Sequence, residues 1–301
     1  MSAGLYSGIG LALLAATAYN TGLILEKRAL GSLPAIDVRR VPRVIVNLVS
    51  SSAWLSGFSL MLVGLACQVI VLSFAPISIV QPVLASGVAL VLVLSRLVLR
   101  EELGGVEFCC VAAMAIVVVA LALSAAGTVT TAGDHASAAA VAAVMIPAVV
   151  IGLLVATSPL RARARKHRAP VTGVSYGIGT GLLYGNASLA IKGMSGILTQ
   201  HHSLAVIAID VVSSPYLYVL VGCSGTAMLL FQVALQSCRA SIVVPVSNVV
   251  GSGYFLIVGT WLFHEQLPAD PSRLTLRLTG IVVAGLVIVV LTRPGFRSAT
   301  S

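Results

Sequence analysis

The sequence predicts an all-α polytopic membrane protein, with about nine transmembrane helices arranged as an inverted repeat. Three observations lead to this fold class. Of the 301 residues, 58% are hydrophobic and only 9% are charged, whereas a soluble domain carries about 25% charged residues. The chain contains many apolar stretches of about 18 or more residues, each long enough to cross a bilayer as a helix. Finally, segments of the first half recur in the second half in the same order.

The apolar stretches define nine spans, and a tenth is the alternative count that the sequence leaves open. The spans fall at about 5–25, 52–73, 76–98, 106–124, 136–157, 171–191, 215–236, 240–263 and 275–292. The first resembles a signal peptide, because ATA at 16–18 is similar to a cleavage site. However, no Lys or Arg precedes its apolar core. Because this span also has a partner later in the chain, we interpret it as a helix of the mature protein.

The basic residues orient the predicted spans. If the N-terminus lies outside, 15 of the 18 Lys and Arg residues fall on the inner side. Since such residues accumulate in cytoplasmic loops, we expect a cytoplasmic C-terminus and a location in the plasma membrane. A nucleic-acid contact is the alternative interpretation of RARARKHR at 161–168, but a short basic loop between spans is typical of a topology anchor. The expected partner is therefore the lipid bilayer, without nucleic acid, and association into a homo-oligomer stays open.

The most informative feature is the repeat between the two halves. Residues 74–103 and 238–267 both contain Ser-Ile-Val-x-Pro, then a glycine, and then a Glu with a Leu two places further on. Tyr and Lys stand at the two ends of both 19–27 and 184–192. These matches pair the first span with the sixth and the third with the eighth.

Gln68 in the second span and Gln232 in the seventh extend the match. Because five spans precede the second unit, the members of each pair cross the membrane in opposite directions. Inverted repeats are typical of transporters, whose substrate site lies between the halves. We therefore divide the chain into a first half at 1–130 with spans one to four, a fifth span with a basic inner loop at 131–170, and a second half at 171–301.

A proline recurs in both halves, inside an apolar helix. Pro82 and Pro245 cannot donate a backbone hydrogen bond to the carbonyl four residues earlier, which belongs to Ser78 in one half and Ser241 in the other. In lipid a free carbonyl is tolerated only where protein or a water-filled cavity satisfies it. We expect both carbonyls to face a lumen. In the alternative interpretation, the serines cap their helices and the prolines fall in a tolerated early turn.

Polar residues in the spans of both halves suggest a pathway through the bundle. Such side chains usually face the interior, where they line a pathway or join helices. The predicted substrate pathway consists of Asn20, Gln68, Ser78, Gln81, Pro82, Asn186, Gln232, Ser241, Pro245 and Asn248. The predicted mouth carboxylates are Glu26, Glu101 and Glu102 on the inner side and Glu265 on the outer side. No charged residue lies at the centre of a predicted span.

Motifs for other chemistry are missing from the sequence. It contains no nucleophile–base spacing, zinc signature or phosphate-binding loop, so we expect neither enzymatic activity nor a cofactor. His201 and His202 are adjacent on a polar loop, and without further ligands nearby such a pair is more often solvated than bound to a metal. Any metal ligands are therefore unknown. The five cysteines lie within or beside apolar segments, and we interpret them as packing residues.

Three short motifs accompany the first three spans. The third span carries AP…V.P…L.E.L, a tryptophan opens the second in WLSGFSLMLVGL at 54–65, and the first closes on G…LILEKRAL. With these motifs the chain resembles the drug/metabolite transporter superfamily, and within it is most similar to the NIPA-type magnesium transporters. The resemblance covers most of residues 5–124 and recurs more weakly in 171–292. It implies nine spans and magnesium as the substrate.

We therefore expect an integral membrane transporter whose substrate is magnesium or another divalent cation. Magnesium keeps several waters, so a pathway of carbonyls and amides with carboxylates at its mouths is able to pass it. A neutral or zwitterionic small metabolite is the alternative substrate, for which amide side chains and apolar walls suffice. A third alternative is a membrane structural subunit without transport, and the inverted repeat argues against it.

Overall fold

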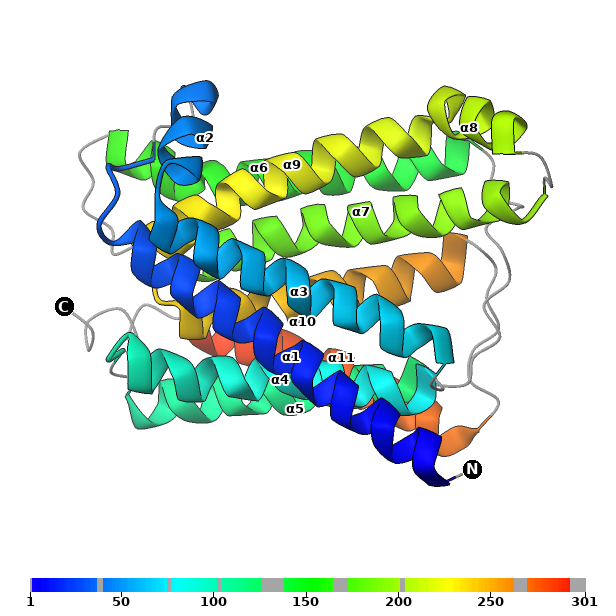
Figure 1. The fold of residues 1–301 in the computed structure, drawn as a ribbon, viewed down its shortest axis with the longest axis horizontal. Coiled ribbons are helices and arrows are strands. Elements are labelled where there is room, and N and C mark those ends of the chain that lie inside the picture. Colours follow the sequence, from blue (N-terminus) through cyan, green and yellow to red (C-terminus); the bar gives the residue numbers. More distant parts are fainter. Residues whose placement is uncertain are drawn as a thin grey trace.

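The fold is a bundle of helices that run roughly along the longest axis of the molecule (Figure 1). The structure is a computed structural model that describes residues 2–36, 40–74, 77–101, 104–125, 138–164, 173–200, 204–262 and 270–292. Within these ranges the chain forms eleven helices and no strand. The expected all-α fold class is therefore confirmed for the described residues.

Nine long helices coincide with the nine predicted spans to within a few residues at most ends. They are α1 (Ser2–Leu30), α3 (Ser52–Phe74), α4 (Ile77–Val98), α5 (Gly105–Ala125), α6 (Ala138–Ala164), α7 (Val174–Gln200), α9 (Pro215–Ser237), α10 (Ala240–Leu262) and α11 (Pro271–Thr292). Two short helices were not predicted, namely α2 (Val41–Val49) and α8 (Leu204–Ser213). Among the described residues, five helices are long and apolar enough to cross a membrane, or six if α2 and the start of α3, bent by 87°, form one broken span. The count of nine spans stays a prediction.

The surface of the bundle is apolar, as expected for a protein whose solvent is lipid. Leu97 is 72% exposed, Ile116 is 69% exposed and Trp261 is 64% exposed. Several polar side chains are instead buried, among them Asn186 and Thr180 at 0%. This distribution suits a multi-pass membrane protein, because polar groups in a bilayer face the protein interior.

Local signals explain where several helices begin. Ser214 accepts a hydrogen bond from the Tyr216 N–H, and Pro215 follows it as the first residue of α9. Asp270 accepts from the Ser272 N–H at 3.0 Å and precedes Pro271, the first residue of α11. Serine and aspartate caps followed by proline are a common way to start a helix, because proline lacks the N–H that has no partner there.

The long helices pack in two similar groups. Helix α1 packs against α3 and α4, while α7 packs against α9 and α10. Helix α6 covers α7, and α5 packs against α4, α10 and α11. Helix α10 lies at the centre, where it contacts both groups. The two groups therefore meet along α10 and at the contact between α1 and α9.

Glycine allows α1 and α3 to approach with their backbones in contact. A Cβ atom added at Gly22 would lie 2.5 Å from the carbonyl oxygen of Gly57. One added at Gly64 would lie 2.5 Å from the backbone nitrogen of Tyr19. Small residues at such crossings are typical of membrane helices, where close van der Waals packing replaces the hydrophobic effect.

Candidate functional site

A buried carboxylate lies where the two groups of helices meet. The predicted first span ended at residue 25, but α1 continues to Leu30, which places Glu26 inside the helix. Its side chain is 2% exposed. Lys27 and Arg28 stand in the last turn of α1, where positive charge complements the helix dipole. Glu26 was predicted as an inner mouth carboxylate; the structure shows it buried within α1 under neighbouring helices, and its role stays a prediction.

The two oxygens of the Glu26 carboxylate have different surroundings. Gln232 of α9 donates from Nε2 to Glu26 Oε2 at 2.7 Å. The Trp54 Nε1–H of α3 donates to Gln232 Oε1 at 3.5 Å, and the Trp54 ring stacks on the ring of Phe58. Glu26 Oε1 is buried and has no hydrogen-bond partner among the described residues. A buried carboxylate oxygen without a partner is costly, so it is available to a proton or a cation.

Helix α3 passes directly beside Glu26. A Cβ atom added at Gly57 of α3 would lie 2.7 Å from the Glu26 backbone nitrogen and 3.1 Å from its Cγ, so glycine allows this close approach. With Gln232 of α9 bonded to the carboxylate, residues of α3 and α9 both lie against this part of α1.

A second set of polar contacts joins α7 and α10. The Tyr254 hydroxyl donates to Asn186 Oδ1 at 3.1 Å, and Asn186 Nδ2 donates to the Leu182 carbonyl at 3.0 Å. Closer to the start of α7, the Thr180 hydroxyl donates a hydrogen bond to the Ser247 hydroxyl of α10 at 3.2 Å. The structure therefore gives Asn186 a contact between helices, one of the roles expected for buried polar residues in membranes.

In the first group of helices, Asn20 of α1 lies against α4, as Asn186 of α7 lies against α10 in the second group. Its Nδ2 donates to the Ala16 carbonyl at 2.7 Å, and a Cβ atom added at Gly87 would lie 2.4 Å from that nitrogen. Asn248 is exposed and donates to the Val244 carbonyl at 2.9 Å. Of the predicted pathway residues, Gln232 alone is in contact with the Glu26 carboxylate among the described side chains.

The remaining predicted residues lie in three different situations. Gln68 is half-buried. Pro245 is buried inside α10 and stands five residues after its first residue, as Pro82 does in α4. The side chains of Ser78, Gln81 and Pro82 and the whole of Glu102 and Glu265 lie outside the described residues. The contacts of these side chains are therefore not described.

Glu101 has a defined structural contact at the start of α10. Its Oε1 accepts from the Ala240 N–H at 2.8 Å, and its Oε2 accepts from the Ser241 N–H at 3.1 Å and the Ser241 hydroxyl at 2.6 Å. Ser241 is 0% exposed. Glu101 was predicted as a mouth carboxylate, and the structure shows that both of its oxygens are already bonded. The preceding residue, Arg100, has a φ of 53°, which turns the chain so that Glu101 N–H returns to the Ser95 carbonyl at 3.2 Å.

Sequence reasoning did not find several residues of this region. Trp54, Lys27, Gln236 and Tyr254 each contact a residue far away along the chain. The only sequence signal for Trp54 is its place at the start of the second span, where an interfacial tryptophan is equally expected. Pairs of this kind are not visible in a single sequence.

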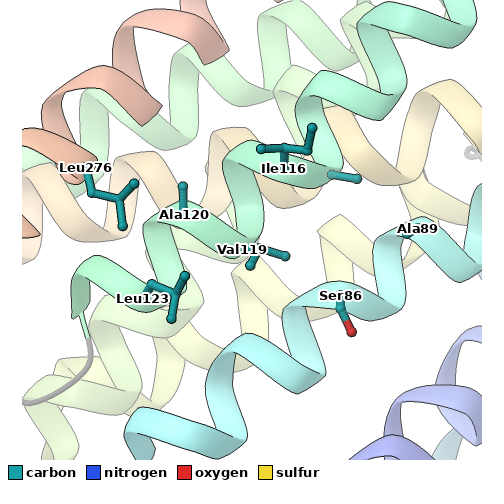
Figure 2. Close-up of a pocket in the computed structure, with 8 residues that line it drawn as sticks. Ser86, Ala89, Ile116, Val119, Ala120, Leu123 and Leu276 are labelled. Atoms are coloured by element: carbon teal, nitrogen blue, oxygen red, sulfur yellow. The ribbon is translucent and has the colours of Figure 1, made fainter.

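The structure also has an apolar groove, between α4, α5 and α11 (Figure 2). Its volume is about 370 Å³, and its walls include Ser86 and Ala89 of α4, Ile116 and Ala120 of α5, and Leu276 of α11. Apart from Ser86 the lining residues are apolar, so the groove offers no ligand for an ion. It faces outward, as the exposure of Ile116 shows, and suits an acyl chain of the bilayer.

A resident metal site is not found in the described part of the chain. No three His, Cys, Asp or Glu side chains gather there, and His201 and His202 lie outside the described residues. The five cysteines form no disulfide bond, and Cys110, Cys223 and Cys238 are buried.

An apolar exterior, a buried carboxylate and polar contacts between two groups of helices are the features of a multi-pass membrane transporter. Comparison with known protein families gives the same class. Residues 4–295 match the family described as "Magnesium transporter NIPA", so the chain belongs to the NIPA magnesium transporter family. The resemblance found in the sequence is therefore confirmed.

A curated relative supports this membership. The chain is 26% identical to the "Probable magnesium transporter NIPA9" of Arabidopsis thaliana, in an alignment that covers 95% of this chain and 82% of the relative. No solved structure gives a significant match. The arrangement around Glu26 is accordingly described from this chain alone.

Proposed function

We propose that this protein carries Mg²⁺ across a membrane and that Glu26 binds the ion on its way. The observation that carries the proposal is the buried Glu26 carboxylate, which has one oxygen fixed by Gln232 and one without a partner among the described residues. In a membrane protein a buried ionisable residue marks a substrate or ion pathway by default. Membership of a transporter family supports transport rather than catalysis.

The ligands at this place suit a hydrated divalent cation. Magnesium prefers oxygen ligands, keeps several waters and is usually bound through one or two carboxylates. Glu26 supplies the carboxylate, and the Gln232 side chain supplies an amide whose oxygen is only weakly engaged by Trp54 at 3.5 Å. A single carboxylate binds weakly enough to release the ion again, which conduction requires.

The pathway runs between two inverted halves, residues 1–130 and 171–301, which 131–170 connect. The directions of the helices support this arrangement. Lys27 near the end of α1 contacts Cys238, and Gly173 before the start of α7 lies beside Cys238 as well, so α1 and α7 run in opposite directions. Helices α2 and α8, which follow α1 and α7, lie at opposite ends of the bundle (Figure 1).

One end of the bundle, which we call the basic end, faces the cytoplasm in this proposal. It contains Lys27, Arg28, Arg100 and Arg239, at the ends of α1 and α4 and between α9 and α10. The excess of Lys and Arg in cytoplasmic loops is the physical reason for this orientation. The N-terminus then lies outside and the C-terminus inside, and the plasma membrane stays the predicted location.

Flux measurements on the purified protein in liposomes test the proposed function. Vesicles loaded with a fluorescent Mg²⁺ indicator should report uptake that empty vesicles do not show, with a rate that saturates as external Mg²⁺ rises. Ca²⁺ and a mixture of amino acids serve as competing substrates. Uptake of radiolabelled amino acids without any Mg²⁺ flux would favour the metabolite alternative and contradict the proposal.

A further inference from the structure

Lys27 of the first half binds the end of α9 in the second half. Its Nζ donates to the carbonyl oxygens of Leu235 and Cys238, which lie 208 and 211 residues further along the chain. The last carbonyls of a helix have no partner within the helix and carry partial negative charge. An ammonium group therefore donates hydrogen bonds to these carbonyl oxygens and also attracts their partial negative charge. This contact ties the last turn of α9 to α1.

Glu101, also of the first half, binds the start of α10. The N–H groups of Ala240 and Ser241 donate to its two oxygens, and these residues lie 139 and 140 positions further along the chain. The first N–H groups of a helix are free and carry partial positive charge, so a carboxylate suits them. Such capping is usually done by a residue just before the helix. Here a residue from the other half supplies it.

A third side chain strengthens the same connection. Gln236, in the last turn of α9, donates from Nε2 to the carbonyls of Leu30 and Pro34, both at 3.1 Å. Its Oε1 accepts from the Ile36 N–H at 2.8 Å. The turn between α9 and α10 is thus held from one side by a lysine and from the other by a glutamate.

These contacts lie between Glu26 and the basic end. Glu26 and Lys27 are neighbours on α1, and Gln232 and Leu235 are less than one turn apart on α9. Leu235, Ala240 and Ser241 are each 0% exposed. Among the described residues, the packed α9–α10 turn therefore lies between Glu26 and the basic end.

We propose that Lys27 and Glu101 form a clamp that closes the pathway at the basic end by holding the α9–α10 turn, and that the clamp opens when Glu26 becomes accessible from that end. Both are positioning residues, since neither touches the ion. The proposal rests on the proposed function in that the clamp controls access to its ion site.

Pro245 provides the place at which the clamp can move. Because it has no N–H, it cannot donate to the Ser241 carbonyl, so the first turn of α10 lacks one of its own hydrogen bonds. Proline is the commonest cause of a bend in a helix. The turn that Glu101 holds is therefore the part of α10 that is least tied to the rest of that helix.

Accessibility of a cysteine at position 232 tests the clamp without requiring any Mg²⁺ flux. The Gln232→Cys variant is made in a background in which the five native cysteines are replaced, and a membrane-impermeant maleimide is added on the basic side. Labelling should be slow with the clamp intact. Glu101→Gln or Lys27→Met should raise its rate by about tenfold, the effect of about 1.4 kcal/mol on the opening equilibrium, and only from the basic side.

The matched control is Arg28→Met, which removes an adjacent exposed basic residue that has no described contact with the α9–α10 turn. Lys27→Arg keeps the donor and should keep labelling slow. If Glu101→Gln does not fold, the comparison of Lys27→Met with Lys27→Arg and Arg28→Met decides. Fast labelling in the intact background, equal acceleration by Arg28→Met, or no acceleration in any folded clamp variant would overturn the proposal. A protein without Mg²⁺ flux would contradict the proposed function alone.

Discussion

At the scale of the residue, the two oxygens of the Glu26 carboxylate differ in their hydrogen bonding. Gln232 donates to Oε2 at 2.7 Å, and Oε1 has no partner among the described residues. The hydrogen bond holds the carboxylate in one orientation and leaves the second oxygen without a described partner. In the proposed function, Gln232 therefore positions the carboxylate and also offers an amide oxygen to the ion.

Replacement of Gln232 by leucine should therefore be harmful, since it leaves the whole carboxylate without a protein partner. A lost hydrogen bond to a charged group costs about 1.5–3 kcal/mol. We expect Gln232→Leu to lower thermal stability in detergent and to reduce Mg²⁺ flux. Gln68→Leu is the matched control, because Gln68 occupies the corresponding place in the repeat but does not contact Glu26. Equal effects of the two substitutions would show that Gln232 has no special role.

The sequence singled out Gln232 as a polar residue within a span, but it did not predict that Glu26 is buried inside a helix. Hydropathy ends the first apolar stretch at residue 25, whereas helix propensity continues through Glu-Lys-Arg-Ala-Leu, all good helix formers. The helix therefore carries Glu26 into the protein. The contact of Glu101 with Ser241 was not predictable at all, because it joins residues 140 positions apart.

At the scale of the element, the position of α3 depends on glycines that face α1. We predict that Gly57→Ala destabilises the protein by about 1–3 kcal/mol, the usual cost of overpacking, because the new Cβ would lie 2.7 Å from the Glu26 backbone nitrogen. Gly253→Ala is the control, since nothing lies within 4 Å of its added Cβ. Thermal unfolding followed by size-exclusion chromatography measures both. A stable Gly57→Ala variant would show that α1 and α3 are less closely packed.

The proline of α10 leads to a prediction on the same scale. Pro245→Ala restores an N–H that can bond to the Ser241 carbonyl, so the helix should be no less stable. If α10 bends at this place during transport, flux should nevertheless fall, by about tenfold for a barrier raised by about 1.4 kcal/mol. Thermal stability and Mg²⁺ uptake are compared in the same preparation. Unchanged uptake would favour the alternative in which Pro245 is a tolerated early-turn residue.

The positions of the nine long helices were predictable, because each is a long apolar stretch. The two short helices were not. Helix α2 is mostly apolar and buries Val44 and Leu48, but with 9 residues it is too short to cross a bilayer on its own. Helix α8 is apolar but only 10 residues long, too short to cross a bilayer. Both depend on packing against a neighbouring long helix.

At the scale of the whole molecule, the two groups of helices run in opposite directions. The end of α4 meets the start of α10 through Glu101, and the start of α3 meets the end of α9 through Trp54 and Gln232. Opposite directions are what an inverted repeat requires. The sequence predicts an inverted repeat from three short matches, and this relation between the two halves stays a prediction.

The orientation in the membrane is tested by labelling cysteines from one side of intact cells. We expect Ala164→Cys, at the end of α6, to be protected from an impermeant reagent outside, because in the proposed orientation the basic end faces the cytoplasm. Ser272→Cys, in the first turn of α11, should react. Permeabilised cells provide the control for both positions. Reaction at 164 with protection at 272 would reverse the orientation.

The most direct test of ion binding at Glu26 measures the stability and the Mg²⁺ uptake of Glu26→Gln together. Glutamine can still accept from Gln232 but removes a buried charge that is only partly compensated, so the thermal stability should stay equal or rise. Uptake should fall by about tenfold or more, since a charge pair at about 4 Å is worth roughly 4 kcal/mol near a protein surface. Asp270→Asn removes an exposed carboxylate and keeps the cap of α11, so its uptake should match the parent. Full uptake in Glu26→Gln would contradict the account.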